Sequence, residues 1–154
     1  MAMQSDYLAG LPRRRIAACA LIRDEQGSVC LVDPTYRDGM ILPGGTVEAN
    51  EAPRDGCGRE VHEELGVRLA IGRLLTMRWV PPTLPADEHG SMILVYDGGV
   101  VDADTIRQFV VPPDELHGLA FIAPDDLDRF TPNGSADRIR GGLEALAANE
   151  LVEF

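Results

Sequence analysis

The sequence is short of basic residues. Its 154 residues contain 14 Lys and Arg against 25 Asp and Glu, which gives a formal net charge of −11 and a pI near 4.6. Non-specific nucleic-acid binders draw their affinity from an excess of Lys and Arg that neutralises phosphates. The composition therefore argues against a nucleic-acid partner. If the protein handles an anionic ligand, we expect a divalent cation to screen the repulsion.

Long hydrophobic runs and cysteine motifs are also absent. The apolar run 16–22 follows three arginines but ends at Arg23 and Asp24, and no stretch approaches the roughly 18 residues of a membrane-spanning helix. The sequence thus predicts no signal peptide and no membrane partner. The three cysteines are widely spaced and form no Cys-x-x-Cys pair. We expect neither a disulfide framework nor a zinc site, and a cytoplasmic location fits best.

No internal repeat or low-complexity tract divides the chain. The apolar share of 45% is sufficient for a hydrophobic core, and the length favours one domain. We expect residues 1–12 to be a flexible N-terminal segment and residues 13–154 to form a single domain.

Short apolar segments separated by turn residues predict strands and helices in alternation. Strands are expected at 15–23 and 28–33, joined by a turn at Gly27, and at 68–80, 91–96 and 119–122. Helices are expected from Ala52 to Gly66, as a turn at 125–129, and at 136–149. The elements lack the regular period of a doubly wound parallel sheet. The pattern therefore favours an α/β sandwich with a mixed sheet.

The first long helix gathers acidic residues on one side. Glu60, Glu63 and Glu64 lie at positions i, i+3 and i+4, so a helix brings their carboxylates together. Like charges at this spacing destabilise an isolated helix unless cations bind them. Grouped carboxylate oxygens suit hard ions, so Mg²⁺ is the expected occupant, with Mn²⁺ as a substitute.

The segment 45–67 resembles a complete Nudix box, G-x5-E-x7-R-E-U-x-E-E-x-G-U, in which U is aliphatic. Gly45 and Glu51 occupy the first two fixed positions, and the chain then reads Arg-Glu-Val-His-Glu-Glu-Leu-Gly-Val from 59 to 67. A pattern of this length is far more specific than a lone glycine motif. Weaker family features are 42–44 before the box, a turn at 97–99, and Glu115 six residues before Phe121.

The resemblance implies a Nudix-type α/β/α sandwich and a metal-dependent hydrolase that cleaves a pyrophosphate bond in a nucleoside diphosphate linked to another moiety. By match to the family, Glu60 and Glu64 are principal metal ligands, and Glu63 is a further ligand or activates water. The carbonyl of Gly45 is expected to ligate a metal as well. Arg59 is expected to orient a carboxylate of the box and Glu51 to support its loop. Glu115 competes with the glutamates of the box for the role of general base.

Three positions depart from the common pattern. Asn50 stands where glycine is frequent, and Gly56 and Gly58 stand where helix formers are frequent. Asn tolerates the left-handed conformation, so we expect the loop to be kept. The two glycines are expected to soften the helix.

The candidate substrate-binding residues are Arg15, Tyr36 and Trp79. Arg15 could contact phosphates or end a disordered tail, and the two aromatic rings could stack on a base or pack in the core. Pro82 lies 15 residues beyond Val67, where family members that cleave ADP-ribose tend to have a proline. This favours an ADP-ribose-like or nucleotide-sugar-like substrate slightly over a nucleoside triphosphate or an oxidised nucleotide.

Two other functions stay open at this point. A Nudix-like sensor that binds a nucleotide without hydrolysing it would be expected to lose glutamates of the box or to gain a second domain, and the sequence shows neither. Isomerase chemistry on an isoprenyl diphosphate would need a catalytic cysteine and metal-binding histidines, for which there is no convincing set. The expected partner is a small-molecule nucleoside diphosphate derivative, and homodimerisation is left open.

Overall fold

The protein is built around one twisted, mixed β-sheet. A computed structural model describes residues 1–83, 85, 87–132 and 134–154. Within these residues the sheet has the strand order β6-β2-β1-β5-β4-β7, and β3 pairs with β1. The strands are β1 (Arg15–Asp24), β2 (Val29–Pro34), β3 (Gly44–Thr46), β4 (Leu74–Val80), β5 (Ser91–Val101), β6 (Leu116–Ile122) and β7 (Val152–Glu153). The pairs β1·β5 and β4·β7 are parallel and the others are antiparallel, which confirms the predicted mixed sheet.

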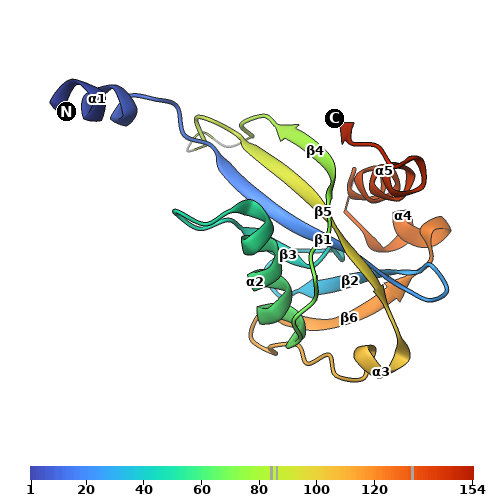
Figure 1. Cartoon of the computed structure of the whole chain (residues 1–154). Coiled ribbons are helices and arrows are strands. Elements are labelled where there is room, and N and C mark those ends of the chain that lie inside the picture. Colours follow the sequence, from blue (N-terminus) through green and yellow to red (C-terminus); the bar gives the residue numbers. More distant parts are fainter. Residues whose placement is uncertain (84, 86, 133) are drawn as a thin grey trace.

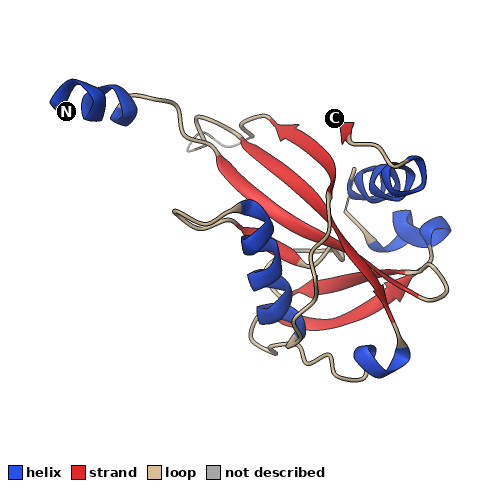
Figure 2. Cartoon of the chain, in the orientation of Figure 1, coloured by secondary structure: helices blue, strands red, loops and turns tan. Residues whose placement is uncertain are grey.

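Helices cover both faces of this sheet (Figures 1 and 2). Helix α2 (Pro53–Leu65) lies on one face, and α4 (Leu127–Phe130) and α5 (Ser135–Ala148) lie on the other. Alternation along β1 divides the core: Ala20 and Ile22 pack with α2, whereas Leu21 packs with α5. The α/β/α sandwich expected from the sequence is therefore confirmed. The remaining helical pieces are α1 (Ala2–Ala9), α3 (Ala103–Ile106) and the 3₁₀ turn η1 (Pro124–Asp126).

The ends of α2 follow the local sequence. Pro53 occupies the first turn, where its missing N–H costs nothing, and Gly66 closes the helix in the left-handed conformation at φ 73°. The prediction of a helix from Ala52 to Gly66 is confirmed.

Three strand predictions were wrong in their extent. The strand expected at 119–122 begins at Leu116, where β6 pairs with Pro34 of β2. The strand expected at 68–80 begins only at Leu74, because Gly72 and Arg73 hydrogen-bond to Asp97 across an irregular stretch. The strand expected at 91–96 continues to Val101, so 97–99 is a bulge within β5 and not a turn after it. Gly98 leaves no room for a side chain there, since an added Cβ would lie 2.5 Å from Ile22 Cγ1.

Residues 1–12 lie apart from the sandwich. Helix α1 projects away from the sheet in Figure 1, and residues 4–12 are exposed. The flexibility expected for this segment stays a prediction. Among the described residues, no helix combines the length and the apolar character needed to cross a membrane.

Candidate active site

Two glycines bring the strand β3 against the acidic helix α2. Gly44 pairs with Cys19 of β1, and an added Cβ would lie 2.4 Å from Ala18 O. At Gly45 an added Cβ would lie 2.5 Å from the carboxylate of Glu60. No larger residue fits at either position without displacing these groups. The backbone of β3 therefore passes in direct contact with the carboxylates of the helix.

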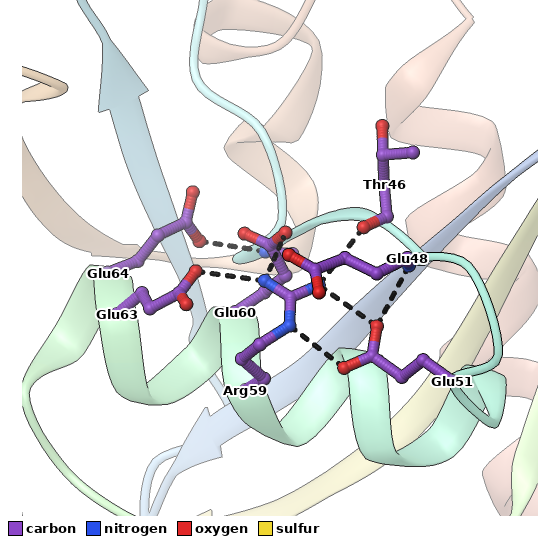
Figure 3. A network of polar contacts seen from close by, with 8 residues as sticks. Thr46, Glu48, Glu51, Arg59, Glu60, Glu63 and Glu64 are labelled. Atoms are coloured by element: carbon purple, nitrogen blue, oxygen red, sulfur yellow. Dashed lines mark hydrogen bonds and ion pairs between the residues drawn. The ribbon is translucent and has the colours of Figure 1, made fainter.

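Arg59 binds the acidic residues together (Figure 3). Its Nε and Nη2 donate to both oxygens of Glu51, at 2.9 and 3.1 Å. Its Nη1 donates to Glu60 Oε1 and Glu63 Oε2, each at 3.0 Å, and Nη2 also donates to Thr46 O at 3.1 Å. Only a planar guanidinium presents donors in this fork geometry. The three carboxylates and the β3 backbone are thus fixed relative to one another.

Glu51 connects the loop to the helix. Its Oε2 accepts the backbone N–H of Glu48 at 2.9 Å, which closes the loop that precedes α2. An added Cβ at Gly56 would lie 2.7 Å from Glu51 Oε2, so glycine leaves the space this carboxylate needs. Asn50 adopts φ 64°, as its tolerance of the left-handed conformation predicts. The departure at Gly56 from the common pattern therefore has a packing reason.

Glu64 is the most buried of the acidic residues, with 7% of its surface exposed. Burial raises the pKa of its carboxyl to about 8, and the nearby charges of Glu60 and Glu115 act in the same direction. The Gly44 N–H, which donates to Glu64 Oε2 at 2.8 Å, opposes this shift. Burial also raises the pKa of Glu60, against the effect of Arg59. The site therefore holds more negative charge than its surroundings stabilise.

The carboxylate oxygens of the acidic site are the type of ligand that a hard divalent cation prefers. Within the described residues, no group of three acidic, histidine or cysteine side chains is already arranged as a metal site. Arg59 Nη1 lies between Glu60 and Glu63 instead. The side chain of Glu63 is 52% exposed and has room to reorient. Carboxylate oxygens with insufficient counter-charge are the ligands that Mg²⁺ and Mn²⁺ prefer.

A pH-dependent stability follows from Glu64. The folded-state pKa near 8 exceeds the ordinary value of 4.5, so the metal-free fold binds this proton more tightly than the unfolded chain does. The corresponding stability is complete below about pH 4.5 and is lost as pH rises through about 8. We expect the free energy of unfolding in EDTA to fall by roughly 2–4 kcal/mol over this range because of this group. Thermal unfolding of wild type and Glu64→Gln between pH 5 and pH 8.5 measures it, and equal slopes for both proteins would contradict the expectation.

A cavity of about 190 Å³ lies beside the same two glycines. Gly44 and Gly45 line it together with Tyr36, Arg37, Ser135 and Arg138. Partial desolvation of the hydroxyl raises the pKa of Tyr36, and the charge of Glu64 acts in the same direction. The structure therefore places the predicted binding residue Tyr36 next to the acidic site.

The other two predicted binding residues lie elsewhere. Arg15 forms an ion pair with Asp87 at 2.6 Å, and its side chain is 65% exposed. Trp79 lies in β4, where the Arg14 guanidinium is 5.1 Å from its ring centroid. Neither is among the described residues that line the cavity. Their role in substrate binding stays a prediction.

Glu115 lies at the start of β6, on an exposed loop. Its carbonyl accepts the N–H of Thr35 at 2.9 Å, which anchors the loop to the end of β2. Its charge contributes to raising the pKa values of Glu60 and Glu64. The carboxylate is thus within electrostatic reach of the acidic site.

The sequence reasoning missed Arg37, Ser135 and Arg138. Arg138 lies within the helix expected at 136–149, and Arg37 follows the candidate binding residue Tyr36. These positions were the only local signals. The three residues meet because the sheet and α5 place them around one cavity.

Comparisons with known proteins agree with this geometry. The profile of the family described as "NUDIX domain" matches residues 13–140. Diphosphoinositol polyphosphate phosphohydrolase 2 of Rattus norvegicus is 47% identical over 64 residues, which cover 40% of this chain and 36% of that protein. The chain thus spans about a third of the length of the curated relatives it matches.

Solved structures show the same fold. The MutT protein of Methanosarcina mazei Go1 has a TM-score of 0.72 at 24% identity, covering 89% of this chain and 99% of that one. The NUDIX domain of Shewanella oneidensis NrtR, in complex with ADP ribose, has a TM-score of 0.71 at 15% identity, covering 93% of this chain and 98% of that one.

Proposed function

The chain belongs to the NUDIX hydrolase family, and on that basis we propose that it is a divalent-metal-dependent hydrolase that cleaves a pyrophosphate bond in a nucleoside diphosphate linked to another moiety. The supporting observation is the arrangement of Glu51, Arg59, Glu60 and Glu63 in one hydrogen-bonded network beside the buried Glu64. This network supports the proposed roles because it gathers oxygen ligands and a general base at one place.

Glu60, Glu63, Glu64 and the carbonyl of Gly45 would hold the cation. A bound Mg²⁺ or Mn²⁺ would screen the negative charge of the pyrophosphate and lower the pKa of a coordinated water. Arg59 positions Glu60 and Glu63, and Glu51 positions Arg59. Because Gly44 N–H holds Glu64 by a single bond, that carboxylate keeps one oxygen for a ligand.

The proposed reaction is a substitution at phosphorus. A carboxylate takes a proton from water, the water oxygen forms a bond to one phosphorus, and the bond from that phosphorus to the bridging oxygen breaks. The departing phosphate keeps the electron pair. Glu63 and Glu115 are the candidate bases, since both are exposed and lie within electrostatic reach of Glu64.

The substrate is proposed at the level of a class. The position of Pro82 favours an ADP-ribose-like or nucleotide-sugar-like compound, and the NrtR domain was solved with ADP ribose. Diphosphoinositol polyphosphates, which appear in the name of the rat relative, are a second candidate class of substrate. We include nucleoside triphosphates and their oxidised forms as a further class.

A substrate panel tests the proposal. Nucleotide or phosphate release is measured with ADP-ribose, NADH, nucleotide sugars, diadenosine polyphosphates, diphosphoinositol polyphosphates and nucleoside triphosphates, each with Mg²⁺ and with EDTA. We expect turnover of at least one class with Mg²⁺ and none with EDTA. Saturable binding without turnover on the whole panel would overturn the proposal in favour of a sensor.

The net charge gives a second expectation. Without a cation the acidic site repels phosphate groups, so the pyrophosphate part of the substrate should bind poorly in EDTA. The affinity is measured by calorimetric titration of a turned-over substrate into Glu115→Gln, a variant that lacks one of the candidate bases and is used to slow hydrolysis during the titration. The affinity with Mg²⁺ is compared with the affinity in EDTA. Equal affinity with and without the cation would contradict it.

A further inference from the structure

Two of the described residues that line the cavity beside Gly44 and Gly45 are cations without carboxylate partners, set in a largely apolar wall. Arg37 and Arg138 line it, and among the described residues neither forms an ion pair. Arg138 donates to the hydroxyl of Ser135 at 3.0 Å, which leaves further guanidinium donors available. No acidic residue is among the described residues that line the cavity.

A third arginine lies close to these two. Arg78 of β4 donates from Nη1 to Gly134 O at 3.4 Å, at the start of α5. Its charge and that of Arg37 act on Arg138 to lower the pKa of that guanidinium, in addition to the larger effect of burial. The three cations therefore repel one another across a partly desolvated space.

Six of the fourteen arginines form ion pairs with the acidic residues of the chain: Arg15, Arg23, Arg59, Arg107, Arg129 and Arg140. Among the described arginines without such a partner, Arg37 and Arg138 are the two that line the cavity. Positive charges gathered around a cavity and kept from carboxylates are the arrangement that an anionic ligand would stabilise.

The cavity and the acidic site share one wall. Gly44 and Gly45 line the cavity, and the same two residues contact Glu64 and Glu60. A substrate whose pyrophosphate lies at the carboxylates therefore has its remaining part within reach of the arginines. The cavity, at about 190 Å³, is smaller than the roughly 300–1,000 Å³ of typical sites for whole organic ligands. It suits one compact group of the substrate better than a nucleoside.

We propose that this cavity binds a second phosphate of the substrate, a phosphomonoester that is not cleaved, through Arg37 and Arg138, with Arg78 adding positive charge. Guanidinium groups match the oxygens of a phosphate in fork geometry. The inference rests on the proposed function and deepens it. The phosphomonoester could belong to a ribose, another sugar or an inositol ring, and these sources share the chemistry that the arginines recognise.

Paired substrates test the inference by activity. ADP-ribose is compared with ADP-ribose 2′-phosphate, and a nucleotide sugar and a diphosphoinositol polyphosphate represent the other sources. We expect KM to be about tenfold lower for the phosphorylated member of the ribose pair or for the inositol compound. Arg138→Gln and Arg37→Gln should each raise that KM about tenfold at nearly constant kcat, while changing KM for unphosphorylated substrates less than twofold. Arg140→Gln, a matched variant on α5 whose arginine is paired with Asp128, should leave both unchanged.

Phosphate binding separates this inference from the proposed function. Inorganic phosphate is titrated by calorimetry in EDTA into wild type, Arg138→Gln and the Glu64→Gln variant. We expect saturable binding to wild type and to Glu64→Gln, and loss of binding in Arg138→Gln, whether or not any substrate turns over. The inference is overturned if phosphate does not bind wild type, if the arginine variants bind it normally, or if KM rises equally for phosphorylated and unphosphorylated substrates, as a site for a base would predict.

Discussion

The Glu64→Gln variant is expected to have a kcat about 10²–10⁴-fold below that of wild type at saturating Mg²⁺. The substitution removes a carboxylate proposed to hold the cation, at a residue of which only 7% is exposed. Glutamine keeps an oxygen that can accept the Gly44 N–H, so the contact between β3 and α2 should persist. The loss therefore falls on the chemistry and not on the fold. Steady-state kinetics with a turned-over substrate measures it.

A matched variant shows whether the effect is local. Glu144 is exposed on α5 on the other face of the sheet. The Glu144→Gln variant makes the same chemical change and should keep kcat within twofold of wild type. Undiminished turnover in Glu64→Gln, or an equal loss in both variants, would contradict the role proposed for Glu64.

Replacing Arg59 by alanine is expected to damage both activity and stability. The side chain is only 25% exposed and contacts three carboxylates and one carbonyl. Without it, Glu51, Glu60 and Glu63 lose their counter-charge and the β3 loop loses its connection to α2. We expect kcat/KM to fall roughly 10²-fold, as for residues that position ligands. Because the network is only partly buried, we expect unfolding free energy to fall by about 2 kcal/mol.

The comparison with a surface ion pair makes this prediction specific. Arg107 pairs with Asp104 on α3, where both side chains are well exposed. The Arg107→Ala variant should lose less than about 0.5 kcal/mol, because exposed pairs contribute little. Arg59→Lys should recover only part of the loss, since an ammonium cannot donate in fork geometry. Urea unfolding and kinetics of the three variants test this, and full recovery by Arg59→Lys would contradict it.

Much of the acidic site could be predicted because its parts are close in sequence. Helical spacing alone places Glu60, Glu63 and Glu64 together. Pro53 and Gly66 mark the ends of α2 through their own backbone preferences. Local chemistry thus determined both the helix and the group of carboxylates on it.

The rest depended on contacts distant in sequence. The strand expected from 68 starts only at Leu74, because pairing with Asp97 of β5 decides where regular structure begins. Gly56 was interpreted as a weakness of the helix, but its lack of a side chain makes room for Glu51. Neither contact leaves a signal in the local pattern.

The cavity lined by Arg37 and Arg138 is the clearest example of a feature that the local sequence does not predict. Arg37 follows β2, Arg78 lies in β4 and Arg138 lies in α5. A sequence with a net charge of −11 gives no indication that three of its cations gather at one place. Only the packing of α5 on the sheet brings them together.

The most direct test of the central claim, cleavage of a pyrophosphate bond by water at the acidic site, is hydrolysis of a turned-over substrate in oxygen-18 water. With Mg²⁺, we predict one labelled oxygen per turnover, bound to phosphorus in a single product, and labelled product that forms about 10²–10⁴-fold more slowly with Glu64→Gln under the same conditions. Label in a product that contains no phosphorus, or products without label, would contradict the account.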